Sequence, residues 1–117
     1  MIKPGMLGSR GEKLALNFLK KQRFTLLEKN YHCRFGEIDL IMMDQSYLVF
    51  IEVRYRKSKE YGGALESIDQ SKQDKLRRSA EFYLSNSNNR NTPCRFDILC
   101  LDGELNNPNY QWIKNAF

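Results

Sequence analysis

The segment GEIDLIMMDQSYLVFIEVRYR places four ionisable side chains in and beside two apolar runs. Glu37 and Asp39 belong to the first run, and Glu52 and Arg54 belong to the second. Both runs are rich in Ile, Leu, Val, Met and Phe, and only a short polar break separates them, so the segment predicts a β-hairpin. If Gln45-Ser46 forms a two-residue loop, Asp39 faces Glu52 and Glu37 faces Arg54. Strand side chains alternate with a period of two, so all four then share one face at one end of the hairpin.

Two carboxylates that face each other across a ladder destabilise the sheet unless a cation lies between them. A divalent metal is one such cation, because Mg²⁺ and Mn²⁺ prefer carboxylate and carbonyl oxygens. The ordinary alternative is that Asp39 and Glu52 are solvated or salt-bridged, as cross-strand charges usually are. In the same way, Glu37 could simply pair with Arg54. From the pattern alone, a metal site and a set of ion pairs both stay open.

Composition predicts one folded domain over residues 1–117, because 117 residues with 41% hydrophobic content can bury one core and leave no room for a second. The net charge of +5 is typical of proteins that bind polyanions, although many basic proteins bind none. A carboxylate cluster on a basic protein suits a metal-dependent reaction on phosphates. This combination favours a nucleic-acid partner.

The remaining sequence features exclude several other classes. No run is long enough for a transmembrane helix, and the start, MIKPGMLGSRGEK, lacks the apolar region of a signal peptide, so we expect a cytoplasmic protein without a membrane partner. Cys33, Cys94 and Cys100 are odd in number and have no C-x-x-C spacing, which predicts reduced thiols. The single His32 argues against a zinc centre. The sequence contains no P-loop, dinucleotide-binding or nucleophile-elbow motif.

The order of elements predicts an α/β fold with a mixed β-sheet flanked by helices. Both faces of the hairpin are apolar, so we expect a sheet that is covered on both sides. Alternation assigns Ile38, Leu40, Met42, Val49, Ile51 and Val53 to one face, and Ile41, Met43, Leu48 and Phe50 to the other. The expected elements are a helix from the capping box Ser9–Glu12 to Gln22, a strand Phe24–Lys29, a polar connection Asn30–Phe35, the hairpin, a basic loop 55–66 with Gly62-Gly63, a helix Ile68–Leu84, a strand Cys94–Leu101 and an edge strand Tyr110–Ile113.

Motifs spread over nearly the whole chain resemble a known family. They are Gly11-Glu12 with Ala15, Asn30, the run GEIDLI from Gly36, the run FIEVR from Phe50 with Arg56, Gly63, Lys72, Ala80, Tyr83-Leu84 and Arg95-Phe96-Asp97. The chain resembles the YraN-like bacterial proteins and, through them, the PD-(D/E)xK nuclease superfamily and, more distantly, archaeal Holliday-junction resolvases. GEIDLI followed by FIEVR is specific at this spacing, whereas a bare D-x(12)-E-x-[KR] pattern would be weak.

The resemblance implies a restriction-endonuclease-like αβββαβ core with a site for Mg²⁺ or Mn²⁺. Asp39 stands for the metal-binding aspartate of the superfamily, and Glu52 is the acid of the (D/E)xK element. The Val53 carbonyl would complete the metal shell. Glu12 is similar to a first-helix glutamate that faces the site, where it would be catalytic or a metal ligand; otherwise it serves only the capping box. Arg54 occupies the position of the catalytic lysine.

Arg54 is the departure from the superfamily pattern, although YraN-like proteins carry arginine here. An arginine can clamp a phosphate through two hydrogen bonds, but it stays charged and cannot act as a base. Three functions therefore stay open: a metal-dependent endonuclease that hydrolyses phosphodiester bonds in DNA, selective for branched or single-stranded structures; an inactive nucleic-acid-binding module on the same fold; and a basic domain that docks an acidic protein.

Five basic residues form the predicted nucleic-acid surface. Arg56, Lys57 and Lys59 follow the candidate site directly, and Lys72 and Lys75 lie on the second helix, where the resemblance places Lys72 in the substrate groove. Such residues are otherwise the solvated face of a loop or helix. DNA is favoured over RNA as the partner, although the sequence leaves both open, and the resemblance implies a role in repair or recombination. It leaves the oligomeric state open, with a homodimer suggested by the two-fold symmetry of a four-way junction.

Overall fold

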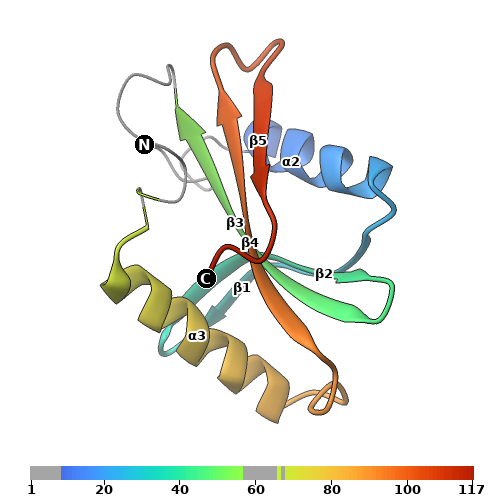
Figure 1. Cartoon of the computed structure of the whole chain (residues 1–117), viewed down its shortest axis with the longest axis vertical. Coiled ribbons are helices and arrows are strands. Elements are labelled where there is room, and N and C mark those ends of the chain that lie inside the picture. The colour runs from blue at the N-terminus through green and yellow to red at the C-terminus, as the bar shows by residue number, and fades with distance from the viewer. Residues whose placement is uncertain (1–8, 57–65, 67) are drawn as a thin grey trace.

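A mixed five-stranded sheet in the order β1-β2-β3-β4-β5 forms the centre of the computed structural model, which describes residues 9–56, 66 and 68–117 (Figure 1). β3 and β4 are parallel, and the other neighbouring strands are antiparallel. The elements in chain order are α2 (Ser9–Lys21), β1 (Thr25–Cys33), β2 (Gly36–Asp44), β3 (Tyr47–Arg56), α3 (Gln70–Ser85), β4 (Cys94–Asp102) and β5 (Asn109–Ile113).

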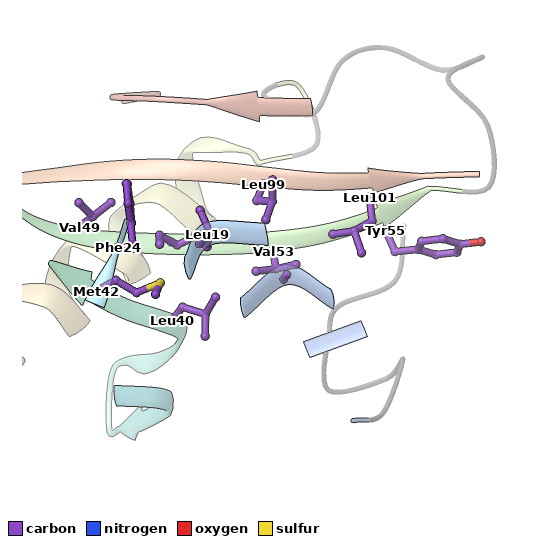
Figure 2. Packing of buried hydrophobic residues seen from close by; sticks show 11 residues of the cluster. Leu19, Phe24, Leu40, Met42, Val49, Val53, Tyr55, Leu99 and Leu101 are labelled. Atoms are coloured by element: carbon purple, nitrogen blue, oxygen red, sulfur yellow. The ribbon is translucent and has the colours of Figure 1, made fainter. Parts of the chain in front are cut away.

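Helices α2 and α3 cover opposite faces of the sheet (Figure 1). Figure 2 shows the cluster on the α2 side, where Leu19 meets side chains such as Leu40, Val53 and Leu99 from three strands. The cluster on the α3 side joins Leu76 to Phe50, Ile98 and other strand residues. Both faces of the sheet are buried, and the central strands are accordingly rich in apolar residues. The structure confirms the expected α/β class and the αβββαβ order with a final strand.

The predicted hairpin and its register are confirmed from Leu40 to Asp44, but the ladder with β3 ends at Leu40, before the predicted pairs of Asp39 with Glu52 and of Glu37 with Arg54. Leu40 pairs with Ile51 and Asp44 pairs with Tyr47, so Gln45-Ser46 forms the two-residue loop. Gln45 has a φ of 56°, the left-handed conformation that tight hairpin turns require. The loop therefore fixes which residues of the two strands face each other.

The first strand is longer than predicted. We expected it to end at Lys29 and to be followed by a polar connection over residues 30–35, but β1 continues to Cys33 and only Arg34-Phe35 form the turn. β1 is an edge strand and much of it is exposed, so polar side chains there remain in water and do not destabilise the fold. The same polar residues lack the apolar pattern by which a strand is predicted from sequence. A register shift between Leu26 and Glu28 interrupts its ladder with β2.

The predicted face of Ile38 is wrong. Ile38 packs in the cluster on the α3 side, whereas Leu40 packs on the α2 side, so the alternation breaks between them. The ladder of β2 with β3 ends at Leu40, while its ladder with β1 continues past Ile38 to Gly36. The first part of β2 therefore follows β1 away from β3 and carries Ile38 toward α3. This separation creates the fork described below.

Helix α3 begins at Gln70, two residues later than predicted, because Asp69 is its N-cap. The Asp69 Oδ1 accepts a hydrogen bond of 2.8 Å from the Lys72 backbone N–H. This bond fixes the first turn of the helix, and with it the position from which the Lys72 side chain extends. The predicted Gly62-Gly63 segment lies outside the described residues.

Cys100 is fully buried in β4, and its thiol donates a 3.3 Å hydrogen bond to Asp102. Burial raises the pKa of the Cys100 thiol from 9.0 to about 12, and the hydrogen bond to Asp102 and its charge contribute in the same direction. Between pH 9 and pH 12 the native thiol keeps a proton that the unfolded thiol has lost, so stability falls as pH rises through this range.

We expect the free energy of unfolding to fall by about 1–2 kcal/mol more in the wild type than in Cys100→Ala between pH 8.5 and pH 10.5. Urea denaturation of both proteins at the two pH values measures this difference. Tyrosines and lysines that titrate in this range contribute equally to both proteins, so the difference between them reports the Cys100 thiol. Equal falls in the two proteins would show that the Cys100 thiol has an ordinary pKa.

Candidate active site

Asp39 lies at the fork where β2 leaves β3. Its Oδ2 accepts a hydrogen bond of 2.9 Å from the backbone N–H of Val53. The side chain thus takes the place that a backbone carbonyl would hold in a regular ladder. Asp39 is 4% exposed, so the bond fixes a carboxylate inside the protein and beside the backbone of β3.

Glu52 precedes Val53 and is even more deeply buried, at 2% exposure. Its Oε2 lies 3.1 Å from Arg54 Nη2 and 3.6 Å from Lys72 Nζ. A buried carboxylate is costly unless cations accompany it, and here one comes from its own strand and the other from α3. Sequence and fold therefore bring three predicted site residues together at one carboxylate oxygen.

The ion pairs differ in part from the predicted arrangement. We expected Glu37 to face Arg54 across the hairpin, but the structure pairs Arg54 with Glu52 and brings Glu37 Oε2 to 3.2 Å from His32 Nδ1 on β1. The reason is again the fork, because Glu37 belongs to the part of β2 that pairs with β1.

Glu12 lies on α2, and its Oε1 accepts a 2.9 Å hydrogen bond from Asn30 Nδ2 of β1. Both residues line a pocket of about 140 Å³ between α2 and the sheet, and Asp39 and Val53 line the same pocket. The structure therefore brings Glu12 to the Asp39 side of the fork, while Glu52 reaches toward α3. As a metal ligand, Glu12 stays a prediction.

The donor set at the fork fits a hard divalent cation. Asp39 and Glu52 supply carboxylate oxygens on neighbouring strands, and Asp39 is bonded to the N–H of Val53, the residue that follows Glu52. Mg²⁺ is commonly held by one or two carboxylates together with waters and substrate phosphates. Within the described part of the chain no three Asp, Glu, His or Cys side chains gather to form a complete cage. The residues thus suit an ion that substrate and water would help to bind.

The predicted nucleic-acid residues have different environments. Lys75 is exposed, and Lys72 is half-buried against Glu52. Arg56 does not fit its predicted role: it is buried, with Nε 2.7 Å from Asp102 Oδ1 and Nη2 2.9 Å from Gln111 Oε1. Its guanidinium is held by these side chains of β4 and β5. Lys57 and Lys59 lie outside the described residues.

Asn30 and Asp69 were not predicted to contribute to the site. Asn30 has a φ of 53°, and this backbone conformation directs its amide toward Glu12. Two signals in the sequence could have identified it: asparagine tolerates the left-handed region better than most residues, and Asn30 is one of the residues that carry the family resemblance. Asp69 could have been identified as an N-cap by its place before the helix.

None of the helices in the described residues has the length and apolar character needed to cross a membrane.

Comparisons with known proteins agree on one family. The model of "Uncharacterised protein family UPF0102" matches residues 11–101. A UPF0102 protein of Nitrosomonas europaea is 49% identical over all of this chain and 98% of its own length. One from Colwellia psychrerythraea is 47% identical over 94% of this chain and 87% of its own length, and one from Neisseria gonorrhoeae is 48% identical over 92% and 91%. The chain therefore belongs to the UPF0102 family, which is the YraN-like family that its motifs resemble.

Proposed function

We propose that this protein is a Mg²⁺- or Mn²⁺-dependent endonuclease that hydrolyses phosphodiester bonds in DNA at the fork between β2 and β3. The observation that carries the proposal is the placement of Asp39 and Glu52, two buried carboxylates on neighbouring strands, with two cationic side chains at Glu52. Buried ionised groups are expensive, and such clusters mark functional sites more often than chance.

When bound, a divalent ion would polarise the phosphoryl oxygen, lower the pKa of a water and steady the leaving oxygen. Asp39, Glu52 and the Val53 carbonyl would hold it. Asp39 is positioned for this role by the hydrogen bond that its Oδ2 accepts from the Val53 N–H. No reorganisation of the strands is then required when substrate arrives.

Arg54 and Lys72 would bind the phosphate beside the carboxylates. Both lie within 3.6 Å of Glu52 Oε2, so an anion at this place would meet two positive side chains from different elements. An arginine can contact phosphate through two parallel hydrogen bonds, and a lysine acts as a point charge. Together they would stabilise the charge that grows on the phosphate in the transition state.

A cleavage assay tests the proposal. Wild type and Glu52→Gln are incubated with Mn²⁺ or Mg²⁺ and labelled single-stranded, duplex, flap and four-way-junction DNA. We expect the wild type to cut at least one substrate and Glu52→Gln, which keeps the shape of the side chain, to cut none. Equal cleavage by both proteins would contradict the proposal.

The second candidate is a nucleic-acid-binding module without catalysis. The specific observation in its favour is Arg54, which is ion-paired to Glu52 at the position of the superfamily's lysine. Binding of the same DNAs without cleavage, with a steep dependence on salt, would support this function. The absence of both binding and cleavage would instead favour an acidic protein partner.

A further inference from the structure

We propose that the pocket between α2 and the sheet binds one unstacked nucleobase of single-stranded DNA, next to the phosphate that is cut. The inference rests on the proposed function, because it names the part of the substrate that the site selects. Among the residues that the structure describes, those that line the pocket come from α2, β1, β2 and β3.

The walls of the pocket are apolar. Ala15 and Leu16 come from α2, Leu40 comes from β2 and Val53 comes from β3. Such walls suit the faces of a base that has left its stack, because contact with them replaces contact with neighbouring bases. The volume of about 140 Å³ is of the size needed for one small planar ring system.

A fixed polar pair lies on one side of the same pocket. Glu12 Oε1 accepts from Asn30 Nδ2, which holds both side chains in place. The second carboxylate oxygen of Glu12 and the carbonyl oxygen of Asn30 are both acceptors. They therefore favour a base edge that carries amino hydrogens, as adenine, cytosine and guanine do and thymine does not.

Two exposed lysines lie at the pocket on different elements. Lys13 is on α2 and Lys29 is on β1. Their charges suit the phosphates on either side of a nucleotide whose base is inserted, and they offset the acidic character of Glu12 and Asp39. Asp39 and Val53 belong both to the pocket and to the fork, so the base site and the candidate reaction centre are continuous.

A fluorescent base analogue tests the inference without cleavage. A single strand that carries one 2-aminopurine is titrated with protein in Ca²⁺ buffer, and a duplex of the same sequence is titrated in parallel. Insertion of the base removes it from its stack, so we expect 2-aminopurine emission to rise when the wild type binds. We also expect a preference for oligo-dA and oligo-dC over oligo-dT.

Leu16→Trp fills the pocket from α2, and Leu27→Trp makes the same change on β1 at an exposed position outside the pocket. We expect Leu16→Trp to abolish the emission rise and to weaken single-strand binding about tenfold, with duplex binding unchanged, because one base contact is lost. Leu27→Trp should resemble the wild type. Asn30→Ala, which does not fill the pocket, should remove the preference over oligo-dT.

An unchanged emission rise and unchanged single-strand affinity in Leu16→Trp would overturn the inference. The outcome is separable from the proposed function. An emission rise in a wild type that cuts no DNA would support the base site and contradict the proposed nuclease activity. Cleavage of single strands that requires Glu52 but is as efficient in Leu16→Trp as in the wild type would support the nuclease and contradict the base site.

Discussion

Asp39→Asn is expected to reduce DNA cleavage at least about 100-fold while it leaves the protein folded. Asparagine keeps an oxygen that can accept the Val53 N–H, but it removes the negative charge that a divalent ion requires. Losses of this order follow when groups that hold or support a catalytic metal are removed. Initial rates of cleavage in Mg²⁺, with melting temperature as the control, measure the effect.

Asp39→Ala serves as the matched comparison. It removes the charge and also the acceptor, so the buried Val53 N–H loses its partner at a cost of about 1–3 kcal/mol. We expect the two variants to be equally inactive and only Asp39→Ala to be less stable. Wild-type rates in Asp39→Asn would show that the carboxylate is structural.

Asp102→Ala is expected to destabilise the protein by about 3–5 kcal/mol, the usual cost of breaking a buried ion pair by removing one partner. Asp102 is 2% exposed and accepts from Arg56 Nε at 2.7 Å and from Arg56 Nη2 at 3.2 Å. The pair joins the end of β3 to β4, and Gln111 of β5 extends it. Urea denaturation measures the loss.

The double variant Arg56→Met/Asp102→Leu is the control for this pair. It replaces both charges by apolar side chains, so we expect it to recover most of the stability that Asp102→Ala loses. DNA affinity should be close to that of the wild type, because Arg56 is buried in the ion pair and does not face solvent. A large loss of DNA affinity in the double variant would show that Arg56 contributes to DNA binding after all.

The sequence predicted the fold wherever side chains decide the structure locally. The hairpin loop, its register and the two helices follow from alternation, turn residues and helical spacing. The prediction was wrong where tertiary contacts decide. Ile38 changes face because β2 leaves β3, and β1 extends to Cys33 because an edge strand accepts polar residues.

The roles of the site residues stay predictions. Asp39 and Glu52 were singled out by their expected opposed positions, but the ladder between β2 and β3 ends at Leu40, one residue before that pair. The contact between Lys72 and Glu52 joins elements that are distant in the chain, so spacing could suggest Lys72 only through the family resemblance. The Glu12–Asn30 bond depends on a left-handed backbone at Asn30, which the residue type permits but does not require.

The central claim, that Asp39 and Glu52 together hold a divalent ion, is tested most directly by titration of Mn²⁺ into the metal-free protein, followed by electron paramagnetic resonance. We expect the wild type to bind Mn²⁺ and the variant Asp39→Asn/Glu52→Gln, which preserves both side-chain shapes, to lose this binding. Equal Mn²⁺ affinity in the two proteins would contradict the claim.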